Sequence, residues 1–110
     1  MEINGPDITK YVVILPNRAP SSVAGLIEKP DANNVPSNLA SIGCYVLTPD
    51  IFNIIRNQTV GTGGEIQLSD AINTQAENNA VESVILNGRR FDCGSVKGYV
   101  EAFKYIYSNY

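Results

Sequence analysis

The chain has 110 residues, a length that suits a single domain. Hydrophobic residues make up 44% of it and charged residues 17%, which is typical of a folded chain and excludes a disordered one. Lys and Arg total 8 against 11 for Asp and Glu, and the resulting net charge of −3 argues against general nucleic-acid binding, which needs a basic surface.

Histidine is absent from the sequence. Its absence excludes Ser-His-Asp and Cys-His nucleophiles, imidazole acid–base catalysis and histidine-ligated metals. Any chemistry must therefore use carboxylates, Lys or Arg, backbone groups or a bound cation. The two cysteines, Cys44 and Cys93, match no zinc-ligand spacing. We expect them to be buried, reduced thiols rather than a disulfide.

Membrane and export signals are not visible either. No apolar run approaches the ~18 residues that a membrane span needs, and the chain shows no charged-then-apolar leader. We therefore expect a cytoplasmic protein with no membrane and no nucleic-acid partner.

Two strands are predicted near the start of the chain. Residues 10–15 are β-branched and apolar, and residues 22–28 form a second run of this kind that ends before Pro30. Residues 31–38 are polar and rich in turn signals, so they should form a surface loop. Residues 41–47 are apolar enough for a third, buried strand.

Two helices are predicted in the middle of the chain. The first should begin at Thr48-Pro49-Asp50, with Thr48 as N-cap and Asp50 at the positive helix end, and run to about Asn57. A glycine-rich turn at 61–64 separates it from a helix over 66–76. The expected inner-face residues are Ile51, Phe52, Ile54 and Ile55 in the first helix, and Ile66, Leu68, Ala71 and Ile72 in the second.

The last part of the chain predicts a hairpin and a helix. Residues 81–86 and 90–93 read as strands on either side of an Asn87-Gly88 turn. Ser95 can cap a final helix, whose apolar stripe needs a partner. The stripe consists of Val96, Tyr99, Val100, Phe103, Ile106 and Tyr107. This alternation favours an α/β fold with helices packed on a mixed sheet.

Three residues stand where chemistry is plausible. Glu28 and Lys29 end an apolar strand, where a carboxylate can accept from sugar hydroxyls and an ammonium can meet a phosphate. A solvated charge pair that ends the strand is the alternative. Asp92 lies in an apolar strand-to-helix corner, where it could bind a cation; alternatively, Asp92 or Ser95 simply caps the last helix.

Two further features are ambiguous from the residues alone. The stretch 61–65 could bind an anion at a helix start, but an ordinary turn is favoured because Glu65 would repel the anion. Arg89-Arg90 could neutralise a phosphate, although a surface pair is favoured. The tyrosines of the last helix favour packing over base stacking.

Five short stretches, in this order, resemble the C-terminal portion of bacterial UTP–glucose-1-phosphate uridylyltransferases. The glycine-rich GGEIQL sequence followed by DAI points to this branch rather than to the thymidylyltransferases. The stretches are 25–30 (GLIEKP), 36–40 (PSNLA), 43–49 (GCYVLTP) with Ile51-Phe52, 63–72 (GGEIQLSDAI), and 88–94 (GRRFDCG) with Gly98-Tyr99.

The resemblance implies a partial Rossmann-like nucleotidyltransferase fold in which residues 1–110 form one sugar-phosphate-binding unit. Glu28 would bind glucose hydroxyls, Lys29 the phosphate of glucose-1-phosphate, and Asp92 would be one of two aspartates that hold Mg²⁺. Ser41 and Tyr45 would lie near the sugar pocket. The family's N-terminal nucleotide-binding half, with its Gly-rich loop and the other aspartate, is not among these 110 residues.

The implied activity is synthesis of UDP-glucose and pyrophosphate from UTP and glucose-1-phosphate with Mg²⁺. We expect no activity and no complete catalytic set in this chain alone. Uncovered edges and patches predict a homo-oligomer. The alternatives are a non-catalytic homo-oligomeric assembly domain and a nucleotidyltransferase for a different sugar phosphate.

Overall fold

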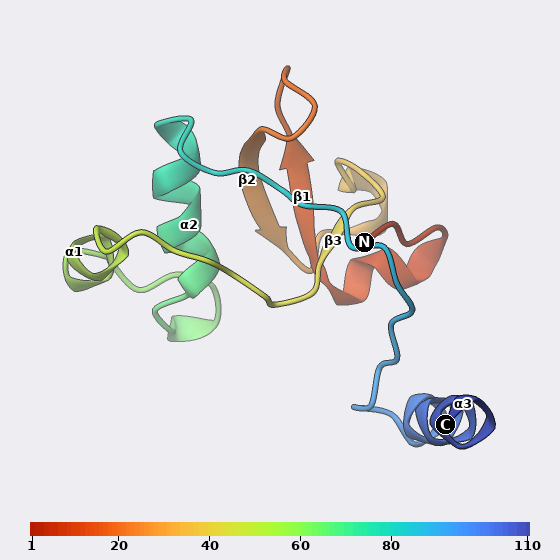
Figure 1. Cartoon of the computed structure of the whole chain (residues 1–110). Helices are drawn as coiled ribbons and strands as arrows, with labels where there is room; N and C mark the ends of the chain where they lie inside the picture. The colour runs from red at the N-terminus through yellow and green to blue at the C-terminus, as the bar shows by residue number, and fades with distance from the viewer.

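The computed structural model describes residues 1–110 apart from the side chain of Thr62. Figure 1 shows a small sheet with two helices beside it and a third helix set apart. The strands are β1 (Val12–Pro16), β2 (Val23–Glu28) and β3 (Ala40–Ser41), antiparallel and in the order β2-β1-β3. The helices are α1 (Ile51–Arg56), α2 (Leu68–Glu77) and α3 (Val96–Asn109), and short 3₁₀ helices cover Pro6–Lys10, Ala32–Asn34 and Thr62–Gly64.

The first two predicted strands are confirmed, and their pairing divides the apolar residues between two faces. Val12 pairs with Glu28 and Ile14 with Leu26, so their side chains lie on the face covered by α1 and α2. Val13 points to the other face, beneath the first 3₁₀ helix. Two small cores result, one of Val23, Leu26, Ile51, Ala71 and Ile72, the other of Ile8, Val13 and Ala40.

Asn73 of α2 attaches this helix to the sheet. Its Oδ1 accepts a hydrogen bond from the Leu26 amide at 2.5 Å, and its Nδ2 donates to the Leu26 carbonyl at 3.0 Å. Because β2 is an edge strand, these are the groups that a further strand would pair with. One side-chain amide thus replaces a neighbouring strand and fixes where α2 lies on the sheet.

Replacing Asn73 with alanine is expected to lower the free energy of unfolding by about 1–3 kcal/mol, since it leaves the partly buried Leu26 amide and carbonyl without partners. Urea denaturation followed by circular dichroism measures this. Asn53→Ala is the control, because Asn53 is exposed and its side chain only accepts a long, 3.4 Å bond from Arg56. Equal losses in the two variants would contradict the role of Asn73.

The start of α1 differs from the prediction. Asp50, not Thr48, occupies the N-cap position, and no side chain caps the helix there. Instead the Thr48 hydroxyl bonds to the Asp50 carboxylate, and buried Gln75 donates to Thr48 Oγ1 at 3.1 Å and to Asp50 Oδ1 at 3.2 Å. The hydrogen bonds from Thr48 and then Gln75 hold the pKa of Asp50 below its ordinary value. Phe52, predicted to face inward, is 66% exposed.

The lowered pKa of Asp50 predicts a pH dependence. The unfolded chain binds this proton more readily, so the stabilising contribution is present above about pH 4 and is lost as the pH falls through the lower pKa of the folded state. Urea denaturation at several pH values between 2 and 5 gives the free energy of unfolding. As the pH is lowered, this free energy should fall less steeply in Asp50→Asn than in the wild type. Identical slopes would contradict this.

The third predicted strand is almost absent. β1 begins at Val12, which already pairs with Ser41, and Tyr11 before it ends a 3₁₀ helix. Residues 42–47 therefore have no strand to pair with, and Val46 is fully exposed. Cys44 and Cys93 are free, as expected, but both are exposed, so the prediction of their burial is wrong.

The strands and hairpin predicted over 81–93 are wrong. Only a short antiparallel bridge forms between Ser22 and Glu82. Its two backbone hydrogen bonds run from the Val23 amide to the Val81 carbonyl at 3.1 Å and from the Ser83 amide to the Ser21 carbonyl at 2.7 Å. Along β2 the amide and carbonyl of Leu26 are already bonded to Asn73, so they are not available to extend this pairing. Residues 84–86 consequently stay exposed.

α3 stands away from the rest of the chain (Figure 1). Its predicted cap is confirmed, since the Ser95 side chain accepts from the Gly98 amide at 3.0 Å. The radius of gyration is 15.7 Å, against about 13 Å for a compact domain of this length. The accessible surface is 8099 Å², against about 5,900 Å² for a compact monomer. The surplus means that much apolar surface, including that of α3, lies uncovered.

Among the described residues, no helix has the length and apolar character to cross a membrane.

Candidate functional site

The predicted site residues meet around the start of β1. The Tyr11 carbonyl accepts a hydrogen bond from the Lys29 amide at 3.1 Å, and the Tyr11 hydroxyl donates to Asp92 Oδ2 at 3.3 Å. The next residue, Val12, pairs with Glu28 on one side and with Ser41 on the other. Tyr11 therefore links the end of β2 to a residue 81 positions later in the chain.

Glu28 and Lys29 are placed as the sequence predicted, at the end of β2. Both side chains are exposed, and neither makes a hydrogen bond or an ion pair with the described part of the chain. Lys29 has a φ of 41°, in the left-handed region that non-glycine residues seldom adopt. Strained backbone of this kind concentrates at binding sites, where the surrounding structure enforces it. Because their side chains are exposed and unpaired, Glu28 and Lys29 are available to bind a ligand.

Asp92 is held by its backbone and by both carboxylate oxygens. Its Oδ1 accepts from the Gly94 amide at 3.1 Å, and its Oδ2 accepts from Tyr11. Its carbonyl accepts from the Ser95 amide at 3.4 Å and from the Ser95 hydroxyl at 3.3 Å. Because Ser95 caps α3, the Asp92 carboxylate is not occupied by capping and stays exposed to solvent.

Ser41 and Tyr45 form a separate pair. Ser41 Oγ and the Tyr45 hydroxyl lie 2.8 Å apart. Since Ser41 and Glu28 both pair with Val12, they share one face of the sheet, whereas Tyr11 belongs to the other. The structure therefore brings the five predicted residues to one end of the sheet, but no hydrogen bond or ion pair between described residues joins Glu28 or Lys29 to Asp92.

Sequence reasoning missed Tyr11 as a site residue, and it favoured a surface pair for Arg89-Arg90, whereas Arg90 is half-buried and contacts Tyr11. The Arg90 guanidinium lies over the Tyr11 ring at 4.5 Å, and its Nη1 donates to the Tyr11 hydroxyl at 3.0 Å. Arg89 turns elsewhere, over the rings of Phe91 and Tyr105 at 5.5 Å and 5.1 Å. The sequence contains no signal that separates Arg90 from Arg89; the distinction comes from the ring over which each guanidinium lies.

A metal ion would find only part of its ligands here. Within the described residues, no three Cys, Asp or Glu side chains gather closely enough to hold one. Asp92 offers one exposed carboxylate of the hard oxygen type that Mg²⁺ prefers. Mg²⁺ usually takes one or two protein carboxylates and completes its shell with phosphate and water, so Asp92 fits as one corner of such a site.

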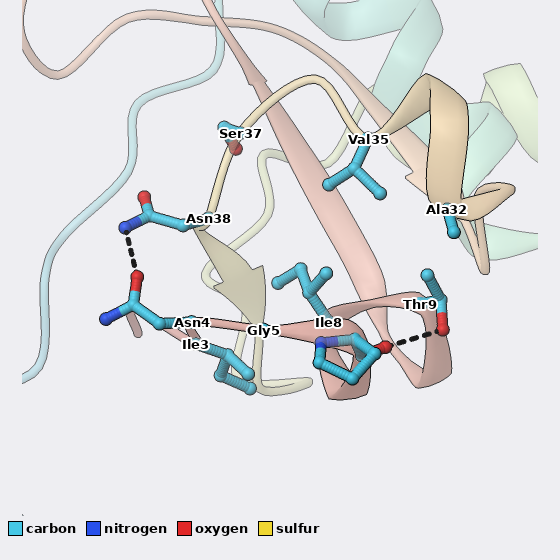
Figure 2. Close-up of a pocket in the computed structure, with 10 residues that line it drawn as sticks. Ile3, Asn4, Gly5, Ile8, Thr9, Ala32, Val35, Ser37 and Asn38 are labelled. Carbon is cyan, nitrogen blue, oxygen red and sulfur yellow. Dashed lines mark hydrogen bonds between the residues drawn. The ribbon is translucent and has the colours of Figure 1, made fainter.

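None of these residues lines the hollow shown in Figure 2. It has a volume of about 370 Å³, and the Asn38 amide, which donates to Asn4 Oδ1 at 3.2 Å, spans its rim. It is lined only by uncharged residues, so it does not suit a phosphate. The lining residues are Ile3, Asn4, Gly5, Pro6, Ile8, Thr9, Ala32, Val35, Ser37 and Asn38.

The glycine-rich stretch 61–65 forms a turn, as favoured. The Gly61 amide donates to the Glu65 carbonyl at 2.9 Å, and the Gly64 amide donates to the Gly61 carbonyl at 3.2 Å. These two amides are therefore not available to an anion. The side chain of Thr62 lies outside the described residues.

Comparison with known proteins places this geometry in a family. A UTP–glucose-1-phosphate uridylyltransferase of Pseudomonas aeruginosa is 42% identical over 113 residues, which is 100% of this chain and 40% of the relative. The Escherichia coli K12 protein of the same name is 44% identical over 81 residues, 74% of this chain and 27% of that protein. The chain thus spans at most about 40% of the length of these relatives.

Solved structures agree. A UDP-glucose pyrophosphorylase complexed with UDP-glucose matches 99% of this chain and 42% of its own with a TM-score of 0.87 and 39% identity. A UTP-bound enzyme from Acinetobacter baumannii matches 93% of this chain and 36% of its own with a TM-score of 0.73 and 33% identity. The predicted α/β nucleotidyltransferase fold is confirmed. Since residues 4–109 also match the nucleotidyl transferase family, this chain belongs to that family.

Proposed function

We propose that this chain is the C-terminal, sugar-phosphate-binding part of a UTP–glucose-1-phosphate uridylyltransferase. The observation that carries the proposal is the meeting of Glu28, Lys29, Ser41 and Asp92 around Tyr11 and Val12. The 42% identity to a uridylyltransferase along the whole chain supports it.

Each residue has a role that its surroundings support. The unpaired Glu28 carboxylate accepts hydrogen bonds from glucose hydroxyls, and the unpaired Lys29 ammonium neutralises the phosphate. Ser41 lies on the same sheet face as Glu28, and its hydroxyl, 2.8 Å from the Tyr45 hydroxyl, would complete the sugar pocket together with Tyr45. Asp92 would be one ligand of Mg²⁺.

The reaction needs no histidine. A phosphate oxygen of glucose-1-phosphate attacks the α-phosphorus of UTP in line, the bond to the β-phosphate breaks, and pyrophosphate leaves. The nucleophile is already ionised, so catalysis consists of positioning and charge neutralisation. When bound, Mg²⁺ would supply part of that neutralisation. In this chain, Lys29 holds the phosphate and Glu28 orients the sugar.

The nucleotide side of the site is proposed to belong to an N-terminal half that contributes the Gly-rich loop and a second aspartate. The relatives are more than twice as long as this chain, which is consistent with that division. We therefore propose that the 110 residues bind the sugar phosphate but do not turn it over. We also propose a cytoplasmic location, the usual setting of this metabolism.

Calorimetric titration with glucose-1-phosphate, with and without Mg²⁺, tests the function. We expect saturable binding of glucose-1-phosphate by the wild type. No binding is expected when glucose, which lacks the phosphate, is the titrant, or when Lys29→Ala replaces the wild type. Lys104→Ala, which removes an exposed cation from α3, is the matched control and should bind like the wild type. If Lys29→Ala and Lys104→Ala bind alike, the assigned phosphate site is wrong. Titration with other sugar phosphates separates glucose-1-phosphate from the alternative substrates.

A homo-oligomeric assembly role is the second candidate, and the α3 stripe favours it. Its residues, between 41% and 84% exposed, lie on one side of a helix of 14 residues, and Lys97, Glu101 and Lys104 lie off that side. Two copies that pair through the stripe would therefore bring no like charges together. The surplus surface of roughly 2,000 Å² exceeds the ~800 Å² that each partner buries in a standard interface.

Introducing a charge into this stripe is expected to abolish self-association. Phe103→Glu would place a carboxylate in the apolar seam, where burying it without a partner is costly. Light scattering across a concentration series should show a dimer or larger mass for the wild type and a monomer for this variant. Ser108→Glu, which adds the same charge off the stripe, should behave like the wild type. A monomeric wild type at high concentration would contradict the assembly role.

A further inference from the structure

Arg90 carries a charge that nothing described in the structure neutralises. The two ion pairs join Lys10 to Asp7 and Lys97 to Glu101, and neither involves Arg90. Its side chain is half-buried at the start of β1, where it reaches Asp92 only through the Tyr11 hydroxyl. A partly desolvated cation without a counter-ion favours an anionic ligand.

The guanidinium is nevertheless held in a defined orientation. It stacks on the Tyr11 ring at 4.5 Å, and Nη1 donates to the Tyr11 hydroxyl at 3.0 Å. The Tyr11 hydroxyl in turn donates to Asp92 Oδ2, and this bond fixes the direction of the Tyr11 O–H group. A guanidinium has five N–H donors, and these contacts use one of them. The remaining donors have no partner in the described residues, so the open side of the fork is available.

Phosphate is the anion that this geometry suits best. An oriented arginine fork binds phosphate oxygens with two parallel hydrogen bonds, which a lysine cannot do. The Tyr11 that orients Arg90 through its hydroxyl also accepts a hydrogen bond from the Lys29 backbone amide on its carbonyl, so Tyr11 joins the two chain positions that carry these cations. We propose that Arg90, held by Tyr11, is a second phosphate-binding residue of this site and acts together with Lys29. The assignment rests on the proposed function.

Arg89 offers a matched comparison. It has the same charge and the adjacent position, but it packs over Phe91 and Tyr105, and the latter belongs to α3. Among the described residues it makes no hydrogen bond or ring contact with Tyr11. Removing Arg89 therefore changes the net charge as much as removing Arg90 does but leaves the Tyr11 arrangement in place.

The test is calorimetric titration of the chain with glucose-1-phosphate and, separately, with glucose. We expect Arg90→Gln to weaken glucose-1-phosphate binding about tenfold or more, the usual effect of losing a charged hydrogen bond, and Arg89→Gln to stay within about twofold of the wild type. Arg90→Lys keeps the charge but loses the fork, so it should bind several-fold more weakly than the wild type. It also serves as the test if Arg90→Gln does not fold.

The outcomes separate the two claims. If the wild type binds glucose-1-phosphate and the Arg90 variants bind as well as Arg89→Gln, the role of Arg90 is refuted while the proposed function stands. If the wild type binds no glucose-1-phosphate, the proposed function and the role of Arg90 both fail. Selective weakening in the Arg90 variants, for the phosphate ester only, supports the assignment.

Discussion

Gly98→Ala is expected to displace Asp92 and detach the start of α3. A Cβ at position 98 would lie 1.9 Å from the Asp92 carbonyl oxygen and 2.7 Å from its carbonyl carbon. These are backbone atoms, so no side chain can move aside. Alanine normally stabilises a helix interior by up to about 1 kcal/mol over glycine. Here a contact of this severity should outweigh that gain and cost about 1–3 kcal/mol or more.

The measurement for Gly98→Ala combines amide chemical shifts with ligand titration. The shifts of Asp92 and Ser95 should change, and binding of glucose-1-phosphate in the presence of Mg²⁺ should weaken. Gly88→Ala is the control, because a Cβ there meets nothing within 4 Å and the residue does not have a positive φ. Unchanged Asp92 and Ser95 shifts in Gly98→Ala would show that the close approach of residue 98 to the Asp92 carbonyl does not hold Asp92 and the start of α3 in place.

The elements that sequence predicted correctly are those with strong local signals. β1 and β2 combine β-branched residues with clear turn signals at their ends, and Ser95 caps α3 as a serine at that position should. The failures are non-local. The apolar residues 42–47 and 84–86 have the composition of strands, but no strand lies where they could pair. Composition indicates that a segment can pair, while topology decides whether a partner exists.

The candidate site shows the same division. Glu28, Lys29 and Asp92 could be proposed because each occupies a position with a local meaning, at a strand end or before a helix. Tyr11 could not, because its importance lies in contacts with Lys29 and Asp92, the second of which is 81 residues away. Arg90 could be distinguished from Arg89 only by the ring on which each one stacks.

Ile72→Ala is expected to destabilise the chain most. Ile72 is 1% exposed and lies in the core that joins α2 to β2 and α1. Truncating a buried isoleucine typically costs about 2–5 kcal/mol, because transfer free energy is lost and a cavity remains. With a total stability of roughly 5–15 kcal/mol for a domain, the variant should unfold at a much lower urea concentration. Tyrosine fluorescence can follow this, since the chain has six Tyr and no Trp.

The matched control for Ile72 is Ile66→Ala. Both isoleucines fit the apolar periodicity of one predicted helix, so sequence alone expects both to face inward. In the structure α2 begins only at Leu68, and Ile66 is 53% exposed. Its truncation should therefore change the free energy of unfolding by no more than about 0.5 kcal/mol. Equal losses at the two positions would mean that Ile66 is buried in solution, and that the helix extends as far toward the N-terminus as its periodicity predicts.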